Sequence, residues 1–169
     1  MKFSTRSLAR AALIAALYAL LTFFLSAISF GAIQFRAAEA LTLLPILTVD
    51  AIPGLFLGCL LANLLGGAVW YDVVFGALAT LAAAFVTHRL RRHPLLATAA
   101  PVIINGVVVG PIVYMAYMRA PGAPLLWPAL LGSAASVALS EAAVCYTLGI
   151  LLLFSLQKIS QKKPDLFKN

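Results

Sequence analysis

The chain has 169 residues, of which 63% are hydrophobic and 10% are charged, and its formal net charge is +7. So few polar residues cannot cover the apolar surface of a soluble domain of this size, and the composition therefore indicates one compact domain in a membrane. The positive charge does not indicate nucleic-acid binding, because the basic residues flank apolar segments instead of alternating with exposed aromatic residues.

Six apolar segments follow one another along the chain, and we expect each to form a membrane helix. They cover residues 8–29, 37–48, 51–69, 73–87, 95–118 and 125–156, and a basic tail follows at 157–169. The second segment is so short that a re-entrant helix is the alternative. With six spans, all the Lys and Arg residues except Arg36 and Arg119 lie on the cytoplasmic side together with both termini, whereas five spans would put residues 89–92 and the tail outside. The sequence thus predicts an all-α, multi-pass protein of the cell membrane.

Small residues recur at helical spacing in the first and third segments. The first segment carries an alanine stripe and its neighbours: Ala11, Ala12, Ala15, Ala16 and Ala19. The third carries small residues at every fourth position: Gly54, Gly58, Ala62 and Gly66. Such patterns let helix backbones approach closely in a membrane. We expect the third helix to pack inside the protein, and for the first helix both internal packing and docking on another membrane protein stay open.

Polar residues gather at two outer turns. Gln34 and Arg36 separate the first two spans, and Glu39 lies in the first turn of the second. A charge pair at a helix start would explain Arg36 and Glu39, but the three together favour a ligand site. Between the third and fourth spans, the segment 70–72 (Trp70, Tyr71 and Asp72) fits either an interfacial aromatic belt with an N-cap aspartate or a lid that stacks on a planar ligand.

Two further polar residues lie within apolar spans. Glu141 must be paired, hydrated or protonated there, so it is either a ligand-binding residue or the partner of Arg36 or Arg119. Asn105 can bridge two helices or recognise a donor–acceptor pair on a ligand. We found no chain of buried carboxylates that would indicate a proton relay.

The other polar residues and the cysteines have simpler interpretations. We expect Asp50 to cap the third helix, His88 to be solvated, and Cys59 and Cys145 to be buried as small hydrophobic residues. No phosphate-binding loop, metal-ligand set or nucleophile motif occurs, so we expect neither an enzyme nor a cofactor in this chain. If the protein moves a solute uphill, a partner would supply the energy.

Three segments resemble the QueT family of queuosine-precursor transporters. They are residues 33–42 (IQFRAAEALT), 53–67 (PGLFLGCLLANLLGG) and 72–80 (DVVFGALAT), and the resemblance extends over nearly the whole chain. It implies a six-helix substrate-binding (S) component of an energy-coupling-factor (ECF) importer in a bacterial plasma membrane. Such a component docks on a transmembrane coupling subunit that two cytoplasmic ATPases drive, so ATP is used by the partners. By the same resemblance, the alanines of the first helix would meet the coupling subunit.

The resemblance also implies a 7-deazaguanine base as substrate. Glu141 or Glu39 would then accept hydrogen bonds from its N–H edge, Asn105 and Gln34 would meet the carbonyl side, and Trp70 or Tyr71 would stack on the ring. Arg36 could instead lock Glu39, and Asp72 would pair with an aminomethyl cation if the ligand carries one. The alternatives are an S component for another vitamin and a self-sufficient small secondary transporter or channel.

Overall fold

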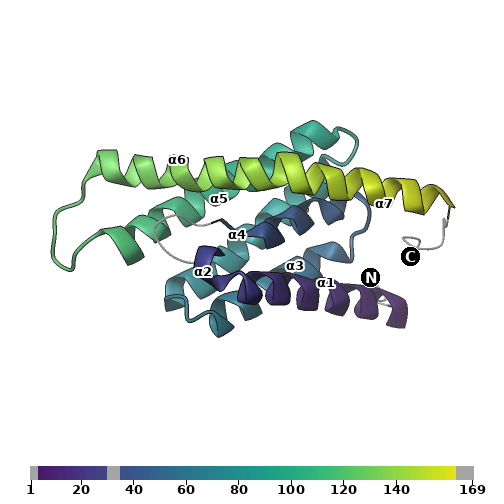
Figure 1. The fold of residues 1–169 in the computed structure, drawn as a ribbon, viewed down its shortest axis with the longest axis horizontal. Helices are drawn as coiled ribbons and strands as arrows, with labels where there is room; N and C mark the ends of the chain where they lie inside the picture. The colour runs from purple at the N-terminus through teal and green to yellow at the C-terminus, as the bar shows by residue number, and fades with distance from the viewer. Residues whose placement is uncertain (1–3, 30–34, 163–169) are drawn as a thin grey trace.

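The computed structural model describes residues 4–29 and 35–162, and it gives the backbone alone for residues 27 and 28. All regular elements in these ranges are helices (Figure 1), so the predicted all-α class is confirmed. In chain order the elements are α1 (Thr5–Phe24), α2 (Ser26–Ser29), η1 (Ala37–Ile46), α3 (Ala51–Leu65), α4 (Trp70–Arg89), α5 (Pro94–Val113), η2 (Tyr114–Met118), α6 (Trp127–Val144), η3 (Cys145–Gly149) and α7 (Ile150–Lys162). The element η1 is a 3-10 helix, and η2 and η3 are π-helical turns that continue α5 and α6.

Four of the helices are long and apolar enough to cross a membrane. They are Thr5–Phe24, Trp70–Arg89, Pro94–Met118 and Trp127–Lys162. The other two are shorter: ten residues of 3-10 helix in η1 rise about 20 Å and fifteen α-helical residues in α3 rise about 22 Å, against about 30 Å of hydrocarbon. The third helix ends before the predicted residue 69 because Gly67 takes a left-handed φ of 70°, which turns the chain toward α4.

The short helix η1 lies inside the bundle. All its residues from Ala38 to Pro45 are buried, and it contacts α1, α3, α4, α5, α6 and α7. Because it begins within the bundle, both Arg36, the residue before it, and Glu39, in its first turn, are buried in the bundle. This placement creates the polar interior described below.

Glycines set the closest helix contacts. A Cβ added to Gly54 of α3 would lie 2.7 Å from the carbonyl oxygen of Ala11, and one added to Gly58 would lie 2.8 Å from the Cβ of Tyr18. The predicted internal packing of the third helix is therefore confirmed. The helices α5 and α6 meet in the same way at Gly106, where an added Cβ would lie 2.9 Å from an α6 side chain. Small residues thus join both pairs of helices.

The alanines of α1 face two ways. Ala11, Ala15 and Ala19 are buried, since this stripe lies on the face that meets the α3 glycines, while Ala12 and Ala16 are exposed. The buried stripe thus shows internal packing, one of the two alternatives left open for the first helix, and docking on a coupling subunit stays a prediction. Only the two exposed alanines can take part in docking without repacking the bundle.

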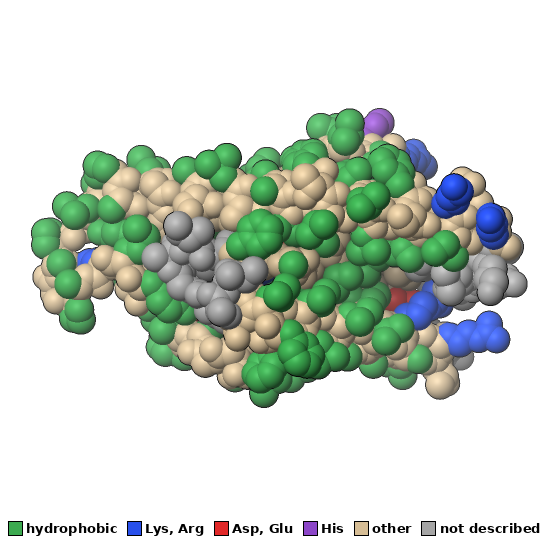
Figure 2. All heavy atoms as spheres, in the orientation of Figure 1, with side chains coloured by type: hydrophobic (Ala, Val, Ile, Leu, Met, Phe, Trp, Pro, Cys, Tyr) green, Lys and Arg blue, Asp and Glu red, His purple; other side chains and the backbone are tan. Residues whose placement is uncertain are grey.

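Basic side chains gather at the end of the bundle where both termini lie (Figures 1 and 2). There the carboxylate of Asp50 accepts a hydrogen bond from the Ser7 hydroxyl and lies 3.1 Å from Nε of Arg10. Asp50 occupies the N-cap position of α3, as predicted, but its side chain makes no capping hydrogen bond and joins α1 to α3 instead. His88 was predicted wrongly as solvated: it is half-buried, with its Nδ1 2.7 Å from the carbonyl oxygen of Pro45.

Candidate ligand-binding site

A small polar cavity lies between η1, α4, α5 and α6. Its volume is about 20 Å³, enough for roughly one water molecule. The residues that line it are Arg36, Glu39, Gly76, Thr80, Asn105, Val109, Val137, Ser140 and Glu141. The structure therefore brings together four of the eight residues predicted to bind ligand: Arg36, Glu39, Asn105 and Glu141.

Local structure explains how the lining residues meet. Arg36 is the residue before η1 and Glu39 lies in its first turn, where the positive end of the helix favours a carboxylate. Asn105 is followed by Gly106, the glycine at which α6 comes close to α5. As a result, Asn105 and Glu141 line the same cavity from neighbouring helices.

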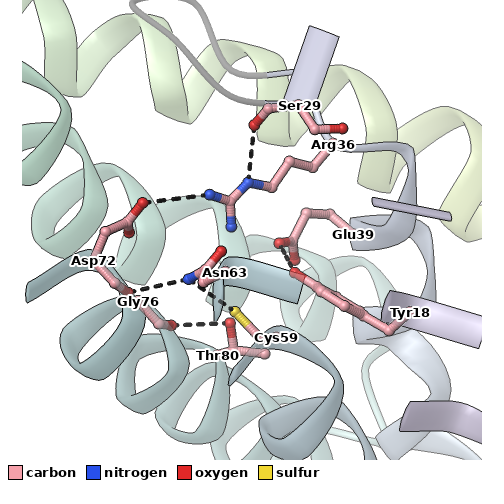
Figure 3. A network of polar contacts seen from close by, with 9 residues as sticks. All are labelled: Tyr18, Ser29, Arg36, Glu39, Cys59, Asn63, Asp72, Gly76 and Thr80. Atoms are coloured by element: carbon pink, nitrogen blue, oxygen red, sulfur yellow. Dashed lines mark hydrogen bonds and ion pairs between the residues drawn. The ribbon is translucent and has the colours of Figure 1, made fainter. Parts of the chain in front are cut away.

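Arg36 joins the cavity to α4 (Figure 3). Its NH2 group lies 3.5 Å from Oδ2 of Asp72, and its Nε donates to the carbonyl oxygen of Ser29 at 3.2 Å. Asp72 is fully buried and does not line the cavity. The ion pair of Arg36 is thus with Asp72, and Arg119, the other proposed partner of Glu141, donates to the carbonyl oxygen of Ala123 instead.

The Glu39 carboxylate is held from α1. The hydroxyl of Tyr18 donates to its Oε1, and Tyr18 is fully buried (Figure 3). The other oxygen of Glu39, Oε2, accepts no hydrogen bond from the described residues, and the same is true of the Asn105 side-chain oxygen. The Glu141 carboxyl lines the same cavity as Glu39. The cavity therefore contains buried acceptors that a ligand could satisfy.

Tyr18 and Thr80 were not among the predicted residues. A tyrosine in the middle of an apolar span needs a partner for its hydroxyl, and this signal could have identified Tyr18. Thr80 gives no such signal, because its hydroxyl donates to the carbonyl oxygen of Gly76, one turn earlier in α4. Asn63 supports the site from α3, since its amide donates to the carbonyl oxygen of Asp72 at 3.1 Å.

The aromatic residues at the start of α4 do not reach the cavity. Trp70 and Tyr71 form an edge-to-face pair with centroids 5.5 Å apart, and Trp70 is 72% exposed. This position fits an interfacial belt, and the stacking lid is not formed in this structure. Asp72 lies in the first turn of α4 and is not its N-cap residue. The remaining predicted residue, Gln34, lies outside the described residues.

The cysteines are free and buried, as predicted. Cys145 lies beside the cavity, with its sulfur 3.6 Å from Oε1 of Glu141 and from the carbonyl oxygen of Glu39. Together the residues that line the site offer one guanidinium, two carboxyl groups, an amide and two hydroxyls within an apolar bundle. Such a set can recognise a small polar ligand by its hydrogen-bonding edges.

Comparison with known proteins places the chain in a family. Residues 8–158 match the family described as QueT transporter. A protein of Lactococcus lactis subsp. cremoris (strain MG1363), named queuosine precursor transporter QueT, is 40% identical over 82 residues, which cover 47% of this chain and 48% of the relative. The match therefore spans about half the length of that relative, and no solved structure matches. Since the family match takes in all six helices, the chain belongs to the QueT transporter family, a family of membrane transporters and not of enzymes.

Proposed function

We propose that the protein is the membrane-embedded substrate-binding subunit of an ECF-type importer and that it takes up a queuosine precursor, a 7-deazaguanine base. The family match supports a role in transport, and the name of the Lactococcus lactis relative supports a queuosine precursor as the substrate. The observation that carries the proposal is the polar cavity, where Oε2 of Glu39 and the side-chain oxygen of Asn105 accept no hydrogen bond from the described residues.

The chemistry of the cavity suits the edge of a guanine-like base. Such an edge presents N–H donors next to a carbonyl acceptor. Glu39 or Glu141 accepts hydrogen bonds from these donors, and the Asn105 amide meets the carbonyl side. A base that lacks these donors would leave buried carboxyl oxygens unsatisfied, and that penalty is an effective means of discrimination.

The cavity must enlarge to admit a base. At about 20 Å³ it holds roughly one water, whereas pockets for small ligands measure about 300 Å³ or more. The bound state thus differs from this one by movement of the helices or side chains around the cavity. Ligand binding should therefore protect the bundle against unfolding, because only the bound state fills the enlarged pocket.

The partner subunits of the proposal are a transmembrane coupling protein and two ATPases. The exposed face of α1 is the candidate docking surface, since it carries Ala12, Ala16 and the 61% exposed Leu13. Replacing Ala16 with Phe should prevent co-purification with a coupling subunit while leaving ligand binding intact. If ligand binding were lost as well, α1 could not be assigned to docking alone.

One observation favours a second candidate function. Glu39 and Glu141 form the buried carboxyl pair that was not anticipated from the sequence, and such pairs occur in proton-driven secondary transporters. A self-sufficient transporter would take up the base into liposomes that contain this chain alone and a proton gradient. An S component would do so only together with its ATPases.

The first test is ligand binding by the purified protein in detergent. The panel contains 7-deazaguanine bases, guanine, adenine, riboflavin and thiamine, and binding is measured by thermal shift and calorimetry. We expect selective binding of a 7-deazaguanine base, weakened at least tenfold by Asn105→Ala. The matched control is Ser155→Ala, which removes an exposed hydroxyl on α7 far along the chain from the site. A response to another vitamin with none to the purines would contradict the substrate.

A further inference from the structure

The two glutamates of the cavity form a carboxyl pair. Glu39 is 4% exposed and Glu141 7% exposed, and both line the same cavity of about 20 Å³, so their carboxyl groups face one space that holds roughly one water molecule. Two carboxylates have no hydrogen atom to share and repel each other in a medium of low dielectric. A buried pair in contact is therefore stable when one proton lies between its members.

The described surroundings of the pair supply one cation, which also faces the carboxylate of Asp72. The titratable and charged groups around it are Tyr18 from α1, Arg36 before η1, Cys59 from α3, Asp72 from α4 and Cys145 from η3. Arg36 is the cation among these groups, and its ion pair is with Asp72. With all three carboxyl groups ionised, one guanidinium would face three negative charges.

The hydrogen bonds indicate which glutamate carries the proton. Glu39 lies in the first turn of η1 and accepts a hydrogen bond from Tyr18, and both features favour its ionised form. Glu141 has a weaker donor, the thiol of Cys145 at 3.6 Å from its Oε1, and its neighbour Asn105 has a buried side-chain oxygen that accepts no hydrogen bond from the described residues. A protonated Glu141 could donate to that oxygen or to Glu39.

We propose that the empty cavity holds one proton on Glu141, shared with Glu39, and that a cationic ligand displaces it. This inference rests on the proposed function for its ligand. On binding, the O–H bond of Glu141 breaks, the proton goes to water, and the resulting carboxylate faces the ligand's cation. The charge of the cavity is then unchanged, because one positive charge replaces another. A neutral ligand offers no such exchange and leaves the proton in place.

The proton itself is tested on the ligand-free protein by infrared spectroscopy at neutral pH. We expect the carbonyl stretch of a buried protonated carboxylic acid in the wild type. Glu141→Gln should abolish the band, while Ser155→Ala, which changes an exposed α7 hydroxyl, should keep it. Absence of the band from the wild type, or its persistence in Glu141→Gln, would overturn the proposal. The wild-type spectrum decides the matter even if the variant does not fold.

The exchange is tested by calorimetry in buffers of different ionisation enthalpy. The probe is 7-deazaguanine carrying a 7-aminomethyl group, and the matched control is unsubstituted 7-deazaguanine. We expect release of about one proton for each aminomethyl probe bound, and no release for the control. The affinity for the probe should rise about tenfold per pH unit over the pH range in which the pair is protonated. Tight binding of the probe without proton release would overturn the inference. Failure of both bases to bind would overturn the proposed function, and the infrared measurement would still decide the proton.

Discussion

The hydrogen bond from Tyr18 to Glu39 connects α1 to the cavity, and its removal is the most informative single change. Tyr18→Phe keeps the ring and its packing against Gly58 of α3, so it leaves no large cavity. What it removes is one O–H donor to a buried carboxylate. Oε1 of Glu39 would then lack this donor in an apolar interior.

The magnitude follows from that loss. A hydrogen bond to a charged group contributes about 1.5–3 kcal/mol, and we expect the free energy of unfolding to fall by about this amount. Glu39 would also lose its fixed orientation and its preference for the ionised form, so it would accept less well from a ligand. Since 1.4 kcal/mol corresponds to a tenfold change in affinity, the Kd for the base should rise by about 10-fold to 100-fold.

The assay compares Tyr18→Phe with Tyr146→Phe in detergent. Tyr146 also donates its hydroxyl to a helix, to the carbonyl oxygen of Leu95 at 3.1 Å, but it is 43% exposed and lies outside the cavity. Its loss should change stability by no more than about 0.5 kcal/mol and leave affinity unchanged. Thermal unfolding measures the first quantity and calorimetry the second. If both variants behaved alike, the assignment of Tyr18 to the site would be refuted.

Three further changes test the packing and the ion pairs by thermal and denaturant unfolding. Gly58→Ala should lower the free energy of unfolding by about 1–3 kcal/mol, because the added Cβ would lie 2.8 Å from an α1 side chain. The control is Gly132→Ala, whose added Cβ has no heavy atom within 4 Å, so it should be neutral or slightly stabilising. Equal effects of the two substitutions would contradict the close contact at Gly58. Asp50→Asn should cost about 3 kcal/mol, because it leaves the guanidinium of α1 without its carboxylate, and an unchanged Tm would show that this ion pair does not stabilise. Arg36→Gln alone should be strongly destabilising, and the double variant with Asp72→Asn should lose less stability than the sum of the two single variants. A loss equal to that sum would refute the coupling of the two side chains.

Much of the architecture follows from composition and pattern. Long apolar runs separated by Pro, Gly and charged residues predict an all-α membrane bundle, because only helices satisfy their own backbone in lipid. The glycine pattern of the third span correctly indicates close packing, since small residues are what allow two membrane helices to touch. These properties are local, and the sequence determines them without knowledge of the partner helix.

The candidate site was predictable in part for a similar reason. Arg36, Glu39, Asn105 and Glu141 are unusual because a polar group in an apolar span is costly unless something satisfies it. That cost identifies the residues but not their partners. Trp70 and Tyr71 carry no such cost at an interface, so the sequence alone could not tell a belt from a lid.

Only the tertiary structure decided which groups meet. It pairs Arg36 with Asp72, which leaves Glu141 beside Glu39, and it uses the hydroxyl of Tyr18 to hold Glu39. In the tertiary structure the alanine stripe of α1 also packs against α3, and η1 begins inside the bundle. In each case the outcome depends on which helices are neighbours, and a buried polar group takes the partner that the packing of apolar helices brings within reach.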